Sequence, residues 1–377
     1  MKRRVQGSLF GVLVAAVLAA QTAFAAEVAR VVETQSGRVA VETVASGLND
    51  PWSLAFLPDG RMLVTERAGR IRIVTHEGNA SAPLPGVPAV YSSGQGGLLD
   101  IALAPDFATS RLIYFSFGEP GEGGASTAVA RARLGDDRLQ DTTVIFRAVP
   151  KTGGGAHFGS RLAFARDGKL FVTTGERFRF DPAQDLSTHL GKVLRINPDG
   201  TVPSDNPFVG RPNVRPEIWS LGHRNVEGAA IHPETGRLWT HEMGPAGGDE
   251  LNITEAGRNY GWPLVSWGRH YDGRDIPDPP TRSDFAQSIR HWVPVIAPSG
   301  MVFYNGDAIP AWKGNLLIGG MVARAIVRLT LNREQVTCEE RISMGGRIRD
   351  VRQGPDGAVY AIDESNGTIL RLTAAER

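Results

Sequence analysis

The chain has 377 residues, a formal net charge of +1 at pH 7, 45 glycines and 24 prolines. Its length allows one large all-β domain or two smaller domains. A nearly neutral chain lacks the basic face that nucleic-acid binding requires, so we expect no nucleic-acid partner. The abundance of glycine and proline, without a long helical periodicity, indicates many short strands and turns.

Residues 1–25 have the features of a secretory signal peptide. A positive start at residues 2–4 is followed by an apolar run at 9–20 and a small-x-small cleavage site, Ala23-Phe24-Ala25. The apolar run is too short to span a bilayer, and no later segment is long enough. Removing the peptide changes the net charge from +1 to −2. We therefore expect a periplasmic or secreted protein without a membrane span, exported by the general route rather than the twin-arginine route that Arg3-Arg4 could indicate.

Cys338 is the only cysteine, so no intramolecular disulfide can form. It lies in a strand-like run, residues 335–338. We expect a buried and unreactive thiol there.

A repeated pattern organises the rest of the chain. Six times, a short apolar strand is followed by a turn, often Pro-Asp-Gly, and by a second strand. The copies lie at residues 52–65, 98–117, 161–174, around 233–236, 301–318 and 348–363. Asp-Gly between two apolar runs is a turn signal because glycine accepts a positive φ. Repeats of roughly 50 to 60 residues made of strands predict an all-β, six-bladed β-propeller of four-stranded antiparallel sheets.

The repeats also suggest how the ring closes. We expect residues 26–377 to form a single propeller domain that begins with an extended segment, residues 26–37. A strand at residues 38–44 should pair with the last blade. The longest insertion, residues 257–298, contains four large aromatic residues, Trp262, Trp267, Tyr271 and Trp292. They could stack on a sugar ring, or they could be core packing under a long loop.

Unusual polar residues stand next to the predicted strand ends. Gln95 precedes the second copy, His157 precedes the third, and Glu176 ends the second strand of the third. The fourth copy carries Arg224, Asn225 and the loop Gly244-Pro245, and the sixth begins with Arg347 and Arg349. In a propeller the starts of inner strands and the neighbouring loops meet at one mouth of the channel. We therefore expect these residues to converge there.

His157 is the best candidate for proton transfer, since histidine titrates near neutral pH. Glu176 could fix its tautomer if the hairpin folds back. A structural histidine is the alternative, and Glu176 and Arg177 could instead form an exposed ion pair. The chain contains no His-x-His or His-Glu-x-x-His metal motif.

Arg347 and Arg349 are spaced by two residues and so share one face of a strand. Two neighbouring arginines repel each other unless anions meet them, so together with Arg224 they indicate a polyanionic ligand. The alternative is a solvated face with acids such as Asp350 nearby. The Gly244-Pro245 loop could offer backbone carbonyls to a hard cation such as calcium, or it could be an ordinary hairpin.

In combination these segments resemble the soluble pyrroloquinoline quinone (PQQ)-dependent sugar dehydrogenases, the glucose and aldose sugar dehydrogenase family of six-bladed propellers. The resemblance covers nearly the whole mature chain. Its motifs are Asp50-Pro51-Trp52, residues 94–99, 157–162, Gln184-Asp185, Gly191-Lys192, residues 222–225, Gly244-Pro245, Asp249-Glu250, residues 259–263 and 346–350.

The resemblance implies a role for each candidate residue. PQQ is an ortho-quinone with three carboxylates, which accounts for Arg224, Arg347 and Arg349. The carbonyls of Gly244 and Pro245 would hold Ca²⁺ against the quinone and polarise it. His157 would take the proton of the anomeric hydroxyl while the C1 hydride passes to PQQ, giving a lactone. Glu176 would orient His157, Gln95 would contact the aldose, and Asn225 would contact the cofactor. An artificial dye, a quinone or a cytochrome would accept the electrons.

One departure from the family pattern concerns the fifth blade. The glucose branch carries a cofactor-contacting lysine there, in a Leu-Lys dipeptide, where this chain has Met321-Val322 with Arg324 two residues further on. Either Arg324 replaces the lysine or the contact is missing, which favours the broader aldose branch. Two other functions compete: a calcium-dependent sugar lactonase, which needs carboxylates around its metal, and a non-catalytic binding propeller.

Overall fold

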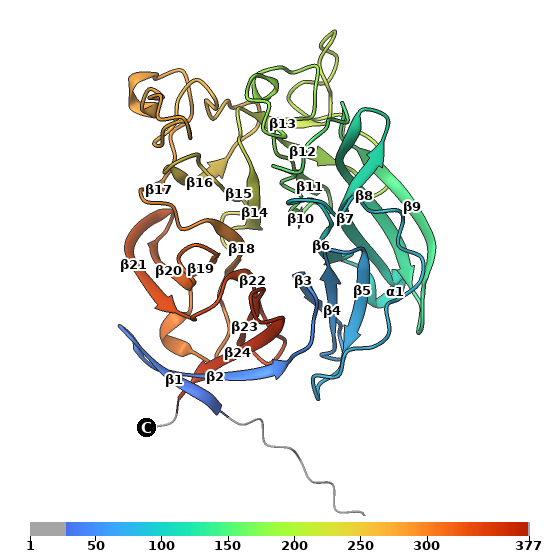
Figure 1. Ribbon diagram of the computed structural model, residues 1–377, viewed down its shortest axis with the longest axis vertical. Coiled ribbons are helices and arrows are strands. Elements are labelled where there is room, and N and C mark those ends of the chain that lie inside the picture. Colours follow the sequence, from blue (N-terminus) through green and yellow to red (C-terminus); the bar gives the residue numbers. More distant parts are fainter. Residues whose placement is uncertain (1–27, 376–377) are drawn as a thin grey trace, which may run out of the picture.

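The computed structural model describes residues 28–375 and is a six-bladed β-propeller, as predicted (Figure 1). The predicted signal peptide, residues 1–25, lies outside the described residues. The first strands of neighbouring blades, beginning with β3 (Pro51–Phe56) and β6 (Leu98–Leu103), contact one another around the central axis. No helix within residues 28–375 is long and apolar enough to cross a membrane.

The blades follow one another in chain order. The first blade contains β3, β4 (Met62–Glu66) and β5 (Arg70–Val74). The second contains β6, β7 (Leu112–Gly121), β8 (Gly124–Leu134) and β9 (Leu139–Arg147). The third contains β10 (Leu162–Phe164), β11 (Leu170–Thr173), β12 (Lys192–Ile196) and β13 (Ile218–Leu221). The fourth blade contains β14 (Val226–Ile231), β15 (Leu238–Glu242), β16 (Asp249–Thr254) and β17 (Arg290–Trp292). The fifth contains β18 (Pro298–Phe303), β19 (Leu316–Gly320), β20 (Ala325–Asn332) and β21 (Gln335–Ser343). The short helices are α1 (Phe107–Ser110), η1 (Asp181–Ala183), η2 (Pro279–Thr281) and η3 (Pro310–Trp312).

The sixth blade closes the ring with strands from both ends of the chain. Its order is β1-β2-β24-β23-β22, with β1 (Val28–Thr34), β2 (Gly37–Ala45), β22 (Ile348–Gln353), β23 (Val359–Asp363) and β24 (Thr368–Ala374). The antiparallel pairing of β2 with β24, which includes Val41 opposite Leu372, confirms the predicted closure. Residues 28–34, within the segment expected to be extended, add a fifth strand to this blade (Figure 1). The first blade has three named strands, and its edge is covered where Ser81 and Leu84 donate to carbonyls of β5.

The Pro-Asp-Gly turns form as the sequence predicts. Gly60 has φ +84°, and its N–H donates to the Leu57 carbonyl at 2.8 Å. The Asp59 carboxylate accepts from the main-chain N–H of Arg61 at 3.1 Å. A side chain at position 60 would be strained because L-residues rarely adopt such a φ. These turns lie at the end of each inner strand, opposite the end where the polar residues cluster.

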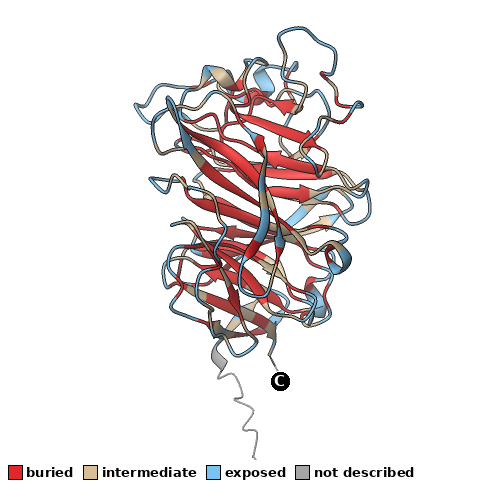
Figure 2. Ribbon diagram, turned by 90° about the vertical axis from the view of Figure 1, so that its right-hand side faces the viewer, coloured by how far each residue is buried: buried red, intermediate tan, exposed pale blue. Residues whose placement is uncertain are grey.

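Buried strands and exposed connecting loops alternate through the molecule (Figure 2). The core lies between neighbouring blades, where one cluster joins Trp239 and Leu251 of the fourth blade to Met301 and Ile318 of the fifth. Each blade buries both faces against its neighbours, because a single four-stranded sheet could not be stable alone.

The prediction of a buried Cys338 is wrong, since the residue is exposed. It lies on β21, the outermost strand of the fifth blade, where the side chains alternate mainly between exposed and half-buried. A strand at the rim of a blade has no neighbouring sheet beyond it, so a strand-like sequence alone does not imply burial there.

A buried ion-pair network joins the inner strands under the channel mouth. Arg161 lies 3.1 Å from carboxylate oxygens of both Asp100 and Asp350, and Arg352 lies 2.9 Å from each of them. Ser53 donates to Asp100 at 2.6 Å and to Asp350 at 3.0 Å. Burial alone would raise the pKa of Asp100, but Arg161, Arg352 and the hydrogen bonds hold it below its ordinary value. Strands of the first, second, third and sixth blades are therefore held together by charges that depend on one another.

We expect Asp100→Ala to lower the free energy of unfolding by about 3–5 kcal/mol, because it leaves the buried guanidinium of Arg161 and the half-buried one of Arg352 without one of their carboxylates. Urea denaturation would measure the change. Asp59→Ala, which removes the exposed pair with Arg61, is the matched control and should cost less than about 1 kcal/mol. Equal effects of the two substitutions would contradict this account of the network.

Candidate active site

A cavity of about 290 Å³ lies where the inner strands begin. Three of the predicted residues, Gln95, Arg347 and Arg349, line it. Its other lining residues are Trp52, Arg67, Phe158, Gly159, Glu227, Met243, Ala297, Met321, Val322 and Glu364. Every blade contributes, from the start of its first strand, from just before that strand or from just after its second strand. The predicted convergence at one mouth therefore holds for these three residues.

His157 and Glu176 form a buried hydrogen-bonded pair beside this cavity. Nδ1 of His157 lies 2.6 Å from Oε1 of Glu176, and Oε2 of Glu176 accepts from the main chain of Arg179 and Phe180. The Gln95 side chain accepts from the main-chain N–H of His157 at 2.6 Å. Nε2 of His157 has no hydrogen-bond partner within residues 28–375, and it is accessible to solvent. Both ring nitrogens of His241, by contrast, are buried as well as unpaired. The pair leaves one ring nitrogen free to accept a proton, with the tautomer set by Glu176.

The environment of His157 favours the neutral imidazole. Burial lowers the pKa of His157 below its ordinary value of 6.5, and the positive charges of Arg224 and Arg177 act in the same direction. The hydrogen bond that His157 donates to Glu176 and the negative charge of that carboxylate oppose them without reversing the shift. A neutral ring is the form that can take a proton, so the site keeps its base available at and below neutral pH.

The alternative of an exposed Glu176–Arg177 ion pair is wrong. Both side chains are buried, and they make no ion pair with each other. The Arg177 guanidinium instead donates to main-chain carbonyls, including that of Gly154 at 2.6 Å, and stacks 3.6 Å from the ring of Phe158. The two residues face different partners because both Arg177 and Phe178 have positive φ, which turns the chain sharply after Glu176.

Arg224 lies next to this pair and engages the Gly244 loop. Its main-chain oxygen accepts from the N–H of Glu176 at 2.9 Å. Its Nη1 donates to the Gly244 carbonyl at 2.7 Å, and its Nη2 to the Tyr271 hydroxyl at 3.2 Å. With Phe178, Pro245 and Tyr271, Arg224 lines a second hollow of about 300 Å³. Phe178 also packs edge-on against the His157 ring at 5.3 Å, so this hollow adjoins the candidate base.

Asn225 is fully buried, and both ends of its amide are used inside the protein. Its carbonyl oxygen accepts from the Gly159 N–H at 2.9 Å, and its NH₂ donates to Glu227 at 3.0 Å. It does not line the cavity; it links the third and fourth blades directly beneath it.

Arg347 and Arg349 share one face, as their spacing predicts, and Glu364 lies between them. Arg349 makes 3.0 Å ion pairs with Glu227 and Glu364, and Arg347 lies 3.3 Å from Glu364. Burial would raise the pKa of Glu364, but Arg349 and Arg347 hold it below its ordinary value. The nearby acid suggested from the sequence, Asp350, pairs with Arg161 and Arg352 instead.

Arg324 does not reach the cavity. Its side chain is exposed, and the main chain at this position, with φ +51°, accepts hydrogen bonds from Met344 and Gly345. Met321 and Val322, the residues that the resemblance aligns with the expected lysine, line the cavity and give it an apolar wall at this point. Arg324 therefore does not take the place of that lysine in this arrangement.

The four aromatic residues of the long insertion divide between the two roles considered for them. Trp262 and Trp292 are buried, and Trp267 stacks on His291 with ring centroids 3.9 Å apart. Tyr271 is 66% exposed and stacks against Phe178 at 6.2 Å. Only Tyr271 of the four presents an open ring near Arg224.

Sequence reasoning missed Arg67, Glu227 and Glu364, which line the cavity. Glu364 could have been found, because it follows the second strand of its blade just as Glu176 does. Glu227 stands two residues after Asn225, the same spacing that drew attention to Arg347 and Arg349. A further triad, Ser220–His223–Glu242, has two 2.8 Å hydrogen bonds but is fully buried, so its serine cannot meet a substrate.

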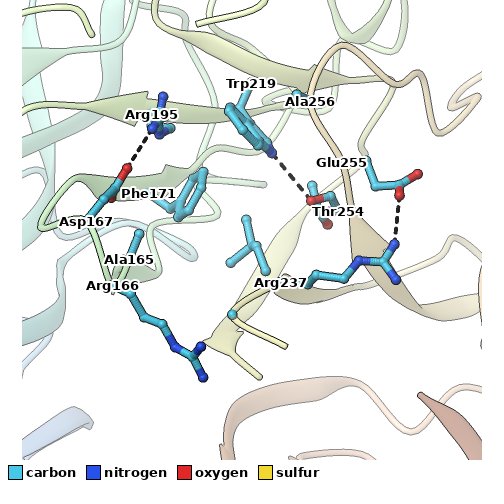
Figure 3. A pocket seen from close by; sticks show the side chains of 12 residues that line it. Ala165, Arg166, Asp167, Phe171, Arg195, Trp219, Arg237, Thr254, Glu255 and Ala256 are labelled. Atoms are coloured by element: carbon cyan, nitrogen blue, oxygen red, sulfur yellow. Dashed lines mark hydrogen bonds and ion pairs between the residues drawn. The ribbon is translucent and has the colours of Figure 1, made fainter. Parts of the chain in front are cut away.

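A separate cavity of about 420 Å³ opens at the other end of the strands, between the third and fourth blades (Figure 3). Phe171 and Trp219 form its apolar part. Four of its charged groups pair with each other, Arg195 with Asp167 at 2.8 Å and Arg237 with Glu255 at 2.7 Å, while Arg166 donates to the main-chain carbonyl of Pro233. None of the predicted site residues lines it, so the candidate chemistry lies at the opposite mouth.

Within residues 28–375, no group of three or more His, Cys, Asp or Glu side chains is placed to hold a metal ion. A cation at the Gly244-Pro245 loop would therefore depend on main-chain oxygens. Asp249 fixes this loop, since it accepts from the N–H groups of Gly244, Ile296 and Ala297 at 2.8–2.9 Å.

The structure therefore places a histidine–carboxylate pair beside a cavity lined by three arginines and two glutamates at one channel mouth of a propeller. Residues 48–371 match the sequence model of the Glucose / Sorbosone dehydrogenase family, and the chain belongs to that family. Membership supports an oxidoreductase that acts on sugars.

The relatives agree with this assignment. The aldose sugar dehydrogenase YliI of Escherichia coli is 45% identical over 89% of this chain and 93% of its own length. Quinoprotein glucose dehydrogenase B of Acinetobacter calcoaceticus is 28% identical over 88% of this chain and 86% of its own. The PQQ-bound aldose sugar dehydrogenase of Streptomyces coelicolor is 30% identical, with a TM-score of 0.74 over 89% of this chain and 98% of its own.

Proposed function

We propose that the protein is an exported PQQ-dependent aldose sugar dehydrogenase that oxidises its substrate at C1 to a lactone. The observation that carries the proposal is the His157–Glu176 pair, with a free Nε2, beside a cavity lined by guanidinium groups. The names of the Escherichia coli and Streptomyces coelicolor relatives support an aldose as substrate and PQQ as cofactor. The predicted signal peptide supports the periplasm or the exterior as its location.

The cavity residues fit an anionic cofactor. Arg67, Arg347 and Arg349 bring three positive charges to the lining, against the two carboxylates of Glu227 and Glu364. Nε of Arg67 and Nε of Arg349 are buried without an acceptor among residues 28–375, so this part of the protein leaves the arginines incompletely satisfied. A ligand with several carboxylates would meet this surplus of charge and donors. Arg347 and Arg349 would hold it from this cavity, and Arg224 from the second hollow beside His157.

The protein's own residues would bring about the proton transfer. His157 takes the hydroxyl proton at Nε2, because Glu176 holds Nδ1–H and thereby leaves Nε2 as the acceptor. PQQ, when bound, supplies an ortho-quinone that takes up the hydride lost from C1. The electron pair of the broken O–H bond then forms the C1 carbonyl of the lactone. Gln95 holds the main chain of His157 and lines the cavity, so it is placed to contact both base and sugar.

A calcium ion at Gly244 and Pro245 fits this arrangement less well. The Gly244 carbonyl already accepts a hydrogen bond from Arg224 at 2.7 Å. A cation bound there would repel the guanidinium and displace it from that oxygen. Gly244 and Pro245 remain the proposed ligands, and we assign no step to calcium. We also propose that a quinone, a cytochrome or an artificial dye accepts the electrons.

We expect purified protein reconstituted with PQQ to reduce a dye with a panel of aldoses as substrates. Protein given NAD in place of PQQ is the control and should be inactive. Chelator treatment followed by calcium addition tests the metal separately, since loss of activity and its return would support a calcium ion at Gly244 and Pro245. Sugar oxidation by protein supplied with NAD alone would refute the proposal.

A further inference from the structure

Arg177 is a buried cation with no acidic partner. The residue is 2% exposed, and within residues 28–375 it forms no ion pair. Its Nη atoms donate to the carbonyls of Ala156 and Gly154, and more loosely to Thr152 at 3.5 Å, while Nε is buried without an acceptor. A charge taken out of water without a counter-ion is costly to stability. Such a cost, next to a candidate base, indicates a functional reason.

The carbonyls that Arg177 holds belong to the loop that leads into His157. Residues 153–155 are all glycine, so the loop has no side chains of its own to fix it, and glycine loses the most freedom on ordering. The guanidinium also stacks 3.6 Å from the ring of Phe158, the residue after His157. His157 itself has φ +51°, a conformation that an ordinary side chain adopts only when its surroundings impose it. Arg177 contacts the chain on both sides of that strained residue.

We propose that Arg177 is a positioning residue for His157: its guanidinium clamps the glycine loop on one side of the histidine and Phe158 on the other, and so fixes the ring against Glu176. The inference rests on the proposed function insofar as His157 is the base. The planar fork of arginine suits the task because it donates to two carbonyls while it stacks on an aromatic ring.

The charge of Arg177 has a second consequence. Three charged groups face the His157 ring: Glu176 and Arg177, which follow β11, and Arg224, which precedes β14. The second blade contributes only the neutral Gln95. Burial lowers the pKa of Arg177 to about 10, so the guanidinium remains charged at neutral pH. Because it repels a protonated imidazole, its loss should raise the pKa of His157 and move the acidic limb of the pH–rate profile upward.

Two readouts test the proposal, and the first needs no cofactor. NMR titration of the His157 ring in the cofactor-free protein should show its pKa higher in Arg177→Met than in the wild type, because a repelling positive charge is lost. In the PQQ-loaded enzyme, kcat should fall at least about tenfold, since displacement of the base misaligns the reacting atoms. Arg177→Lys keeps the charge but loses the fork, so His157 should titrate nearly as in the wild type while kcat still falls.

Arg133→Met is the control, because Arg133 is an exposed arginine whose guanidinium donates to the Ser110 carbonyl, away from the glycine loop. It should leave both readouts unchanged. Wild-type His157 titration and wild-type kcat in Arg177→Met would overturn the proposal. If that variant does not fold, a wild-type kcat in Arg177→Lys would overturn it equally. If the wild-type enzyme oxidises no sugar while the titration moves as expected, the proposed function fails and the positioning role stands.

Discussion

His157→Ala is expected to lower kcat about 10²–10⁴-fold, the contribution typical of general-base catalysis. The substitution removes Nε2, a ring nitrogen beside the cavity that is open to solvent and has no hydrogen-bond partner in the described part of the chain. PQQ binding should change little, because the arginines that line the cavity do not contact the His157 ring. Steady-state kinetics at saturating PQQ, together with a PQQ titration, would measure both quantities.

Two further variants define the origin of the loss. His76→Ala removes an exposed histidine whose ring contacts the Asp59 carbonyl at the opposite end of the strands, and it should leave kcat unchanged. Glu176→Gln keeps a hydrogen-bonding group at Nδ1 but removes the charge, so its loss should be smaller than that of His157→Ala. A normal kcat in His157→Ala would show that another group takes the proton.

The fold was predictable because its signals are local. The Asp59-Gly60 turn requires a positive φ that glycine supplies, and the same turn recurs with Asp356-Gly357 at the other end of the chain. A strand before the first copy had no partner nearby, so pairing with the last blade was the simplest closure. Cys338 was misjudged because strand character does not tell an outer strand from an inner one.

The site was predictable only in part. The position of a residue at a strand end follows from the repeat, and this brought Gln95, Arg347 and Arg349 together correctly. The repeat does not reveal which residue each of these side chains pairs with, because the partners come from other blades. Arg349, for example, pairs with Glu227, 122 residues away in the sequence. The sequence alone also left Arg324 as a possible cofactor contact. Its exposed side chain results from the turn after β19, a local geometry that no spacing reveals.

Arg347→Ala is expected to weaken PQQ binding about ten- to hundredfold. A charge-assisted hydrogen bond to a carboxylate is worth roughly 1.5–3 kcal/mol, and each 1.4 kcal/mol is a factor of ten in affinity. Arg347 is a better probe than Arg349, because the Arg349 side chain is buried between two carboxylates and its loss would leave Glu227 without its ion-pair partner. The Arg347 side chain is 44% exposed, and Glu364 keeps its pair with Arg349 when Arg347 is removed.

Titration of the cofactor-free protein with PQQ, followed by fluorescence quenching, would give the affinity directly. Arg324→Ala is the matched control, since it removes an exposed arginine of the fifth blade that does not line the cavity. Excess PQQ should restore most of the rate to Arg347→Ala and none to His157→Ala, because the first loses binding and the second loses the base. Unchanged affinity in Arg347→Ala, or an equal loss in Arg324→Ala, would place the cofactor carboxylates elsewhere on the channel mouth.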